Sequence, residues 1–551
     1  MSNFIKSIFK KHSLLPYILV FCLVICVAII RYPNYDFINY RCSDATWHTL
    51  LTMNALDETS ISVHHFLPIV SLGQDSDKFI SWSGSTVADD LGNYYYVSFS
   101  AGSFVVPYIF CKLFSLPFSE SSLYLLNSIL LLISSLFLVR LFTDLYISTY
   151  NKPLSPLLAL LCIFFYITSP EILHITGIVW WAHSLFQTTF IIQLFCFSKI
   201  QAKQGRLLFK CIFFLLCILN PYIEWSGHVA NLGFIVGTFF NQNILLKEKV
   251  RRVAFIIGCT FLSGVLFIGH YLSVLSPTAF FSVLSERFLS RSDSSGDIGY
   301  LDLFSGYLSS FGIALLLLLV LVVLIYLTRH KRSNRVFVWQ HNIGLCVAFI
   351  FPVLENPLML RHAVIYSYDR AKLGITLTLI FFSCTSYLWE EGLVPKMRRF
   401  FVAGLVVISF VSNFIVYVNN SDYLWNASYR ESNSVIATYL QNNYDGHNSI
   451  IGSSVQVRGY SNLLFHRGIY EYTTFSETIE LAKSHQKQYA IFLISSDTSF
   501  VDSWSMIKYY GAYIYDIKAN KYFTLSLNEN HIVLTQSDAL PPSDTYNVSL
   551  F

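Results

Sequence analysis

Long apolar runs recur along most of this chain, and they restrict its fold more than any other feature of the sequence. A helix needs about 20 predominantly apolar residues to cross the roughly 30 Å hydrocarbon core of a bilayer. Eleven stretches come close to that length: residues 14–30, 120–140, 154–170, 180–199, 207–223, 227–243, 252–273, 303–327, 337–354, 371–389 and 399–418. Because the bilayer core offers the backbone no hydrogen-bond partners, such segments cross as helices. We therefore predict a polytopic α-helical membrane protein with about 11–13 membrane segments.

The composition agrees with this prediction. Hydrophobic residues make up 54% of the chain and charged residues only 13%, which is far more apolar than a soluble protein. The net charge is only +4 over 551 residues, and the lysines and arginines fall in short clusters between the apolar runs. We therefore expect no nucleic-acid partner. Of eleven cysteines, only Cys42 lies in a loop expected outside, so we expect no intramolecular disulfide there. The first run lacks a small-x-small cleavage site before Arg31, and we interpret it as an uncleaved span.

Clusters of Lys and Arg indicate which loops face the cytoplasm. They occupy the N-terminus and residues 140–152, 199–210, 247–252, 329–335 and 396–399, and two expected crossings separate each cluster from the next. Such loops stay in the cytoplasm, and an odd number of crossings then places the C-terminus outside. Residues 99–116 would break this parity if they crossed fully, so we interpret them as a re-entrant or membrane-parallel segment. The expected location is a bacterial cytoplasmic (inner) membrane, with the N-terminus in the cytoplasm.

This pattern divides the chain into four regions. They are the N-terminus with the first span (1–30), a first exoplasmic loop with membrane-parallel helices (31–98), a multi-span module (99–418) and a C-terminal exoplasmic domain (419–551). In the last region short apolar runs predict helices at residues 434–444 and 475–486, and strands at 449–457 and 489–494. Further strands are expected near Tyr513, Tyr522 and Ile532. We therefore predict a small α/β domain.

Unusual polar residues gather on the expected outer side of the membrane. Besides the acidic first loop, they lie in the segments SPEILHITGIVWWAH, NPYIEWSGH and ENPLMLRHAVIYSYDRAK. Their members are Glu171, His174, Trp180, Trp181, His183, Asn220, Tyr222, Glu224, Trp225, His228, Glu355, Arg361, His362, Tyr368, Asp369, Arg370 and Lys372. An ionisable group at membrane depth costs on the order of 2.5–3.5 kcal/mol on insertion scales, so a cluster of them indicates a function. The four loops are expected to line one outward-facing cleft.

Each of these residues also has a structural interpretation. The tryptophans suit an interfacial aromatic belt, and Asp44 suits the cap of a helix that begins at Ala45. The acid pairs at residues 57–58 and 89–90 suit solvated turns. The cations of residues 361–372 also suit ordinary charges that flank a span. The histidines also suit interface residues whose hydrogen bonds are satisfied locally.

The arrangement resembles the GT-C superfamily of membrane glycosyltransferases. The resemblance lies in an acid shortly after the first span, the run GNYYYVSFSAGSFVVPYIFCKLF closing a long first loop, the segment SPEILHITGIVWWAH and the C-terminal α/β domain. Its branches include lipid A aminoarabinose transferases, protein O-mannosyltransferases and bacterial transferases that modify lipopolysaccharide or O-antigen. The resemblance implies a hexosyltransferase-type enzyme that takes a sugar from a polyprenyl-phosphate carrier. The acceptor would be a glycan or glycolipid at the outer face of the membrane.

Residue by residue, the resemblance places the catalytic base at Asp44. The chain departs from the family pattern in two places. Val97, Ser98 and Phe99 stand where relatives often have Lys-Pro-Pro or His-Pro-Pro, which leaves the donor-phosphate contact unassigned. His183 stands about where they often carry an Asp, which puts a metal-assisted mechanism in doubt. The sequence requires no metal or other cofactor and leaves a divalent metal open.

The chemistry of such a transfer needs a base and positive charge. A sugar hydroxyl is a poor nucleophile, and a carboxylate that takes its proton accelerates attack by roughly 10²–10⁴-fold; Asp44 suits this task. The leaving phosphate needs charge neutralisation, for which the candidates are Arg361, His362, Arg370 and Lys372. Direct displacement would invert the anomeric configuration. Candidates for binding the sugar and acceptor are Asp57, Glu58, Asp89, Asp90, Tyr94, Tyr95, His174, His183, Glu224, Trp225, His228 and Glu355.

Two other functions remain open. A transporter or flippase of a lipid-linked sugar would carry ionisable groups near the bilayer midplane and often shows repeated halves, whereas here the polar residues lie toward one face. An O-antigen polymerase or ligase also works at the outer face with a large external loop. It differs in its donor, a chain on a diphosphate carrier.

The predicted topology is testable with reporter fusions. A reporter fused after Phe551 is expected to be active only outside the cytoplasm, and one fused at Arg332 only inside, because positive loops are retained in the cytoplasm. Cytoplasmic activity of the C-terminal fusion would place every candidate loop in the cytoplasm and contradict the site assignment.

Overall fold

The computed structural model describes the chain in fifteen segments, and all structural statements below concern these segments. They are residues 14–31, 43–72, 85–177, 179–202, 207–241, 244–292, 296–329, 337–390, 403–404, 406–415, 427–453, 458–471, 474–495, 508–528 and 531–539. The chain forms two compact units. The helical unit comprises Met1–Tyr32, Leu123–Gly269 and Phe288–Asn420, and the loop-and-sheet unit comprises Pro33–Ser122, His270–Arg287 and Ser421–Phe551.

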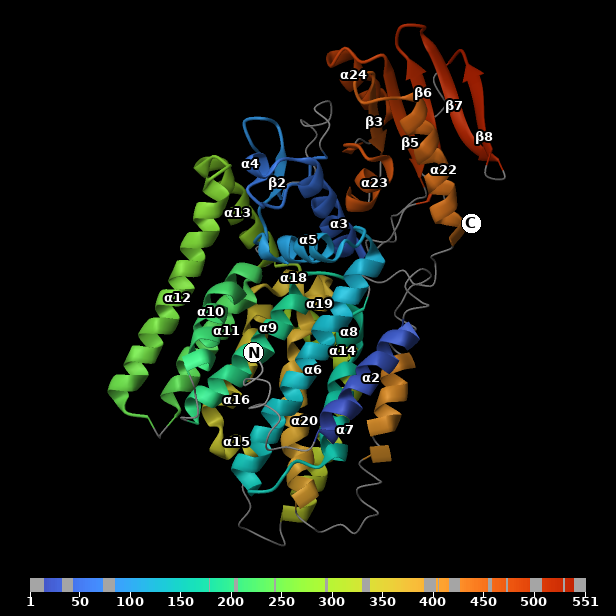
Figure 1. The fold of residues 1–551 in the computed structure, drawn as a ribbon. Coiled ribbons are helices and arrows are strands. Elements are labelled where there is room, and N and C mark those ends of the chain that lie inside the picture. The colour runs from blue at the N-terminus through green and yellow to red at the C-terminus, as the bar shows by residue number, and fades with distance from the viewer. Residues whose placement is uncertain are drawn as a thin grey trace. The chain divides into compact units, whose positions relative to one another are not determined.

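Long apolar helices build the helical unit (Figure 1). They are α2 (Leu15–Arg31), α6 (Glu120–Tyr150), α7 (Pro156–Ile167), α9 (Ala182–Gln201), α10 (Leu207–Ile223), α11 (Ser226–Phe239), α12 (Leu246–Leu272), α14 (Tyr300–Arg329) and α20 (Lys372–Glu390), with the short α8 (Pro170–Ile175). Among the described residues, four helical stretches are long and apolar enough to cross a membrane: Glu120–Tyr150, Leu246–Leu272, Tyr300–Leu327 and Ser367–Glu390. Shorter apolar helices accompany them. The predicted polytopic α-helical class is confirmed.

One expected span is broken into pieces. Residues 337–354 were expected to form a single crossing, but the structure divides the segment and its continuation into short elements. They are α15 (Val338–His341), α16 (Ile343–Ile350), η3 (Phe351–Leu354), α17 (Glu355–Leu358), α18 (Leu360–Ile365) and α19 (Ser367–Arg370). Pro352 and Pro357 each lack a backbone N–H, and their rings disfavour a continuous helix. Within the expected span the helix is interrupted at Asn342, and after Leu358 the chain continues as separate short helices that carry polar residues of the site.

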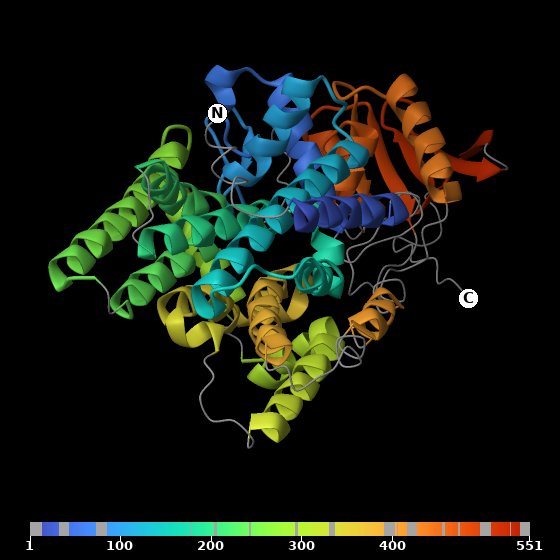
Figure 2. The ribbon, with the colours of Figure 1, turned by 60° about the horizontal axis from the view of Figure 1, so that its bottom comes forward.

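Small residues let two helices of the helical unit approach closely. In α11 a Cβ added to Gly237 would lie 2.2 Å from the carbonyl oxygen of Gly344 in α16, and a Cβ on Gly344 would meet Gly237 equally closely. The helices α9, α10 and α11 lie side by side (Figures 1 and 2). Glycine contacts of this kind are typical of membrane helices, where packing rather than the hydrophobic effect drives association.

Buried amides also connect these helices. Asn220 on α10 donates to Gln193 Oε1 on α9 at 2.6 Å, and Gln193 Nε2 donates to Asn231 Oδ1 on α11 at 3.2 Å. Asn231 in turn donates to the Thr260 hydroxyl on α12 at 2.8 Å. Each such bond across membrane helices is worth about 0.6 kcal/mol, up to roughly 1–2. The network therefore fixes the relative register of four helices.

The C-terminal part of the loop-and-sheet unit is an α/β domain (Figure 1). Its strands are β3 (Ser449–Ser453), β4 (Tyr470–Glu471), β5 (Tyr489–Ser495), β6 (Tyr509–Asp516), β7 (Lys521–Asn528) and β8 (His531–Ser537), in the order β4-β3-β5-β6-β7-β8. The first three strands are parallel and the others antiparallel. The helices are α22 (Ala427–Asn443), α23 (Arg458–Phe465) and α24 (Phe475–Ser484). The predicted α/β domain is confirmed.

Local sequence and packing explain this domain. Thr474 and Glu477 form a capping box at the start of α24, as the expected helix there requires. That helix packs on β3 and β5, and its Phe475 joins Ile450 and Phe492 in the core.

The first loop belongs to the same unit as this domain. It forms α3 (Ser43–Glu58), α4 (Ile61–His64), the hairpin of β1 (Thr86–Ala88) and β2 (Tyr94–Tyr96), and α5 (Gly102–Phe114). The helix α3 packs on α23 of the α/β domain. A further helix that the sequence did not predict, α13 (Pro277–Arg291), starts in this unit. At 13 residues, α5 is only about 20 Å long, too short to cross a bilayer by itself.

The glycine contact between α11 and α16 generates a stability prediction. Gly237→Val is expected to lower the thermal unfolding midpoint of the detergent-purified protein, because overpacking a close contact costs about 1–3 kcal/mol. The matched control is Gly258→Val on α12, since a Cβ at Gly258 has nothing within 4 Å. Equal midpoints for the two variants would contradict the close contact.

Candidate functional site

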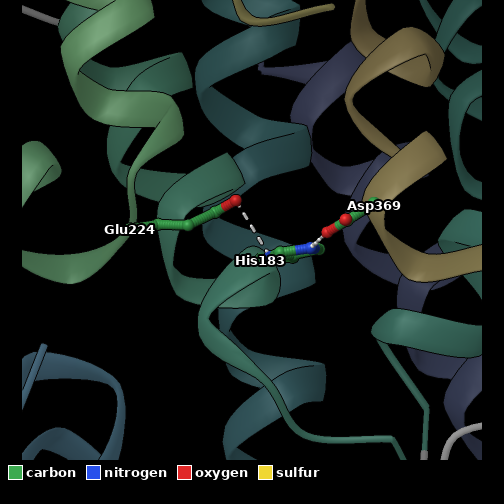
Figure 3. A group of neighbouring side chains, drawn as sticks. All are labelled: His183, Glu224 and Asp369. Carbon is green, nitrogen blue, oxygen red and sulfur yellow. Dashed lines mark hydrogen bonds and ion pairs between the residues drawn. The ribbon is translucent and has the colours of Figure 1, made fainter. Parts of the chain in front are cut away.

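Buried ionisable side chains gather in the helical unit where α9 begins, α10 ends and α20 begins. His183, the second residue of α9, lies at their centre and is only 1% exposed. Its Nδ1 lies 3.0 Å from Oε1 of Glu224, and its Nε2 hydrogen-bonds to Oδ1 of Asp369 (Figure 3). One imidazole thus bridges two carboxylates that stand 145 residues apart in the sequence.

Local structure explains the position of Glu224. It occupies the break between α10 and α11, three residues after Pro221 in the last turn of α10. At Gly227 an added Cβ would lie 2.2 Å from the backbone of Asn220, so only glycine lets the two helix ends approach this closely. The backbone N–H of Glu224 still bonds to the Asn220 carbonyl at 3.0 Å. This tight junction directs the carboxylate toward His183.

Asp369 also binds a second histidine. Its Oδ2 accepts a hydrogen bond from Nδ1 of His362, which lies on α18. The Tyr368 ring contacts the His183 ring edge-on, with ring centroids 4.9 Å apart. Asp369 therefore lies between two imidazoles, and all of these groups come from the broken segment and the start of α9.

Lys372, the first residue of α20, brings positive charge to the cluster. Its ammonium lies 3.4 Å from Oε1 of Glu224 and forms an ion pair with Glu355. The hydroxyl of Ser226 lies 2.7 Å from Oε1 of Glu224 and also contacts Glu355, so its single proton serves one of the two carboxylates at a time. Lys372 is 3% exposed, and the two glutamates are also buried.

A neighbouring group holds Arg370. Its Nη1 donates to the carbonyls of Ala363 at 2.8 Å and Val364 at 2.9 Å, and its Nε donates to the Ser310 hydroxyl at 2.9 Å. That hydroxyl donates to Glu171 at 2.6 Å. Most donors of Arg370 are therefore engaged in holding the broken segment against α14 and α8.

His174 contacts the neighbouring group, and for Arg361 the structure gives its burial and its place in the chain. His174 places Nδ1 3.7 Å from the second oxygen of Glu171, one helical turn along α8. Arg361, by contrast, is half-buried at the start of α18.

The central cluster carries more negative than positive fixed charge. Glu224, Glu355 and Asp369 are three carboxylates, and within the described segments Lys372 is the one lysine whose ion pairs with them are seen. Each uncompensated buried ion costs several kcal/mol. Protons on the histidines or on a carboxylate, or a divalent cation, would balance this formal excess of two negative charges.

The donor set fits a transition metal. His183, Glu224 and Asp369 each offer one ligand atom, and these three atoms lie within 4.8 Å of one another. Mixed imidazole and carboxylate ligands suit Zn²⁺ and related ions. A histidine that ligates a metal through one nitrogen usually donates its other N–H to a carboxylate. His183 has a carboxylate at each nitrogen, so in this geometry one carboxylate would lie beside the ion and the other would orient the ring.

The acidic residues of the first loop lie in the loop-and-sheet unit. Asp44 stands in the first turn of α3, and its side chain lies outside the described part of the structure. Asp57 forms an ion pair with Lys112 at 2.7 Å. Glu58 pairs with His466 of the α/β domain at 3.1 Å.

The hairpin residues make local contacts. Asp89 accepts hydrogen bonds from the backbone N–H of Asn93 at 2.8 Å and from the buried Tyr95 hydroxyl at 3.2 Å, which shapes the turn of the hairpin. Asp90 is exposed on that turn, and Tyr94 is half-buried.

The cluster unites some predicted residues and leaves others apart. Of the predicted candidates, the structure brings together His183, Glu224, Glu355, His362 and Lys372. Trp225 and His228 follow Glu224 closely in the sequence, and their rings stack with centroids 5.9 Å apart. Asp369 and Glu171 were recognised only as unusual polar residues.

Ser226 and Ser310 were missed by the sequence analysis. Ser226 follows Glu224 by two residues next to an expected span, and this proximity could have indicated it. A serine within the apolar run of α14 gave no signal for the second.

Comparison with known proteins gives likenesses in structure but not in sequence. No protein-family model matches the chain, and no curated protein matches it. The archaeal oligosaccharyltransferase AglB from Archaeoglobus fulgidus, in complex with an inhibitory peptide and a dolichol-phosphate, matches with a TM-score of 0.53 and 12% identity over 86% of this chain and 69% of that one. The same oligosaccharyltransferase in complex with Zn and sulfate matches with a TM-score of 0.53 and 10% identity, over 87% and 68%.

A third likeness is ArnT from Cupriavidus metallidurans bound to undecaprenyl phosphate, with a TM-score of 0.48 and 12% identity, over 94% of this chain and 99% of that one. The likeness to AglB shows which fold this chain has. This chain has a GT-C-type fold. The predicted fold class is thereby confirmed, and the ionic cluster is a feature of this chain within the GT-C fold.

Metal content of the purified protein tests the donor set. We expect dialysed wild-type protein to retain about one Zn²⁺ or Mn²⁺, measured by mass spectrometry of the metal. His183→Ala should weaken metal binding by at least roughly 10–100-fold, the loss typical of removing even an outer partner. His228→Ala serves as control, since that histidine lies outside the donor set. Equal metal content in all three proteins would make the cluster an ion-pair network alone.

Proposed function

We propose that this protein is a membrane glycosyltransferase that moves a sugar from a polyprenyl-phosphate carrier to a glycan or glycolipid acceptor. The GT-C-type fold supports this function, because its structural neighbour AglB was solved with a dolichol-phosphate. The observation that carries the proposal is the buried cluster around His183 within that fold. Buried groups of this kind in a membrane protein indicate a functional site.

The reaction that we propose is a direct displacement. An acceptor hydroxyl oxygen attacks the anomeric carbon, the bond from that carbon to the phosphate oxygen breaks, and the electron pair leaves with the phosphate. The hydroxyl proton passes to a carboxylate, for which Asp44 is our candidate. One displacement inverts the anomeric configuration, and no covalent sugar–enzyme intermediate forms.

The leaving phosphate is weakly basic, so stabilising its charge matters more than protonating it. A divalent ion, when held by His183, Glu224 and Asp369, would supply that positive charge. Lys372 and Glu355 set the charge balance around the donor set through their ion pair. Arg361, half-buried at the start of α18, is our candidate for a direct phosphate contact.

For the acceptor and location, the proposal rests on the sequence. We propose an acceptor at the cell surface, such as O-antigen or lipopolysaccharide, and a bacterial inner membrane with the α/β domain outside. The positive-inside pattern of the loops supports this sidedness.

Asp44→Asn tests the catalytic base. The substitution keeps the side-chain shape but removes the proton-accepting charge, so transfer from a polyprenyl-phosphate sugar in membrane vesicles should fall by about two orders of magnitude or more. Glu480→Gln is the control, since it removes a carboxylate charge from an exposed position on α24 and belongs to none of the candidate sets. Comparison of surface glycans from cells with and without the protein identifies the acceptor.

The alternative role of Asp44 gives a different result. A helix-capping aspartate can be replaced by asparagine at little cost. Near-normal transfer by Asp44→Asn would make the residue structural and move the search for the base to Asp57, Glu58, Asp89, Asp90 or Glu224.

A further inference from the structure

A second candidate binding site lies at the opposite end of the same helices. A cavity of about 690 Å³ is lined by residues of α9, α10, α11 and α12, among them Phe197, Phe213, Phe214 and Phe255. Ile200 on α9 also lines it and follows His183 by seventeen residues, about 25 Å along one helix. The cavity is therefore separate from the ionic cluster. Its volume falls within the roughly 300–1,000 Å³ typical of ligand pockets.

Most of the side chains that line the cavity are apolar, and some of them are exposed at the surface of the helical unit. The rings of Phe214 and Phe255 contact each other across α10 and α12, with centroids 5.3 Å apart. Phe255 is 57% exposed and Leu207 is 76% exposed, although both line the cavity. In a bilayer such surfaces contact acyl chains. A lipid chain can thus enter this cavity sideways without crossing water.

Basic residues occupy one margin of the cavity. Lys210, Arg251 and Arg252 line it together with a single acid, Glu248. Glu248 pairs with Arg251 at 2.6 Å and with Nε of Arg252 at 3.0 Å. Three cations against one carboxylate leave an excess of two positive charges. These residues belong to two of the Lys/Arg clusters, 199–210 and 247–252, that the positive-inside rule assigns to the cytoplasm.

One donor in this margin lacks an acceptor. Nη1 of Arg252 is buried and has no hydrogen-bond partner within the described segments. A buried donor without a partner costs about 1–3 kcal/mol, more when charged. A phosphate oxygen from a molecule in the cavity would satisfy it. Guanidinium groups suit phosphate because their donors are arranged in a fork.

We propose that this cavity binds a phospholipid with an anionic headgroup. The headgroup phosphate contacts Arg251, Arg252 and Lys210, and an acyl chain lies between the phenylalanines. Basic pockets between membrane helices on the cytoplasmic side are known to bind such headgroups. The bound lipid holds α12 to α9 and α10, and is independent of the transfer reaction.

Lipid binding to the full-length protein, purified and delipidated in neutral detergent, tests the proposal. The probes are phosphatidylglycerol, phosphatidylcholine with the same chains, and inorganic phosphate. We expect phosphatidylglycerol alone to raise the unfolding midpoint and to remain bound in native mass spectrometry. The double variant Arg251→Gln/Arg252→Gln should weaken this binding about 30-fold, since each basic residue near an anionic lipid contributes roughly fivefold.

Two further variants separate the headgroup from the chain. Lys249→Gln removes a charge from the same helix, but Lys249 donates to the Phe239 carbonyl at 2.7 Å and does not line the cavity, so binding should be unchanged. Cys259→Trp fills the cavity and should abolish binding, whereas Cys22→Trp on the exposed face of α2 should not.

Three results would overturn the proposal. Equal binding of phosphatidylglycerol and phosphatidylcholine would exclude headgroup recognition. Full binding by Cys259→Trp would exclude the cavity. An equal shift from inorganic phosphate, unaffected by Cys259→Trp, would reduce the site to a surface anion site.

Discussion

The pairing of buried charge is the constraint on which the site depends. Three carboxylates, on Glu224, Glu355 and Asp369, are removed from water against the ammonium of Lys372. Because each unpaired ion would cost several kcal/mol, the groups are stable there only while they contact one another. The ends of α9, α10 and α20 therefore have to meet at His183, and that requirement fixes the arrangement of the helices more strictly than apolar packing in lipid does.

The same constraint accounts for the broken segment before α20. A continuous helix advances 5.4 Å per turn, so it would spread Glu355, His362, Asp369 and Lys372 along more than 20 Å. The short helices α17, α18 and α19 fold the chain back and bring these residues to one place. Irregular backbone at membrane depth requires protein partners for its polar groups. Arg370 supplies two of them by donating to the carbonyls of Ala363 and Val364.

Sequence patterns predicted the kinds of element and their polar ends, but not the partners. Hydropathy located the long helices because span length is set by the bilayer, and the outer segments were recognised because ionisable residues there are rare. The contact of His183 with Asp369 joins residues 186 positions apart, and no periodicity encodes such a pairing. His183, where an Asp is common in the family that the sequence resembles, put a metal-assisted mechanism in doubt and left a divalent metal open. In the structure two carboxylates, on Glu224 and Asp369, lie beside this histidine.

The α/β domain supports the first loop because its helix α23 packs against α3. A Cβ on Gly459 of α23 would lie 2.7 Å from the backbone of His48 on α3, and the rings of Trp47 and Tyr460 meet with centroids 4.9 Å apart. The helix that carries Asp44 is thus seated on this domain. Glu58 at the other end of α3 accepts a hydrogen bond from His466, which raises the pKa of that histidine above its usual value. The stabilisation from this pair is therefore complete below the ordinary histidine pKa of about 6.5 and is lost as pH rises through the raised value. The contact of the domain with α3 therefore weakens as pH rises past this raised pKa, while the glycine contact at α23 is independent of pH.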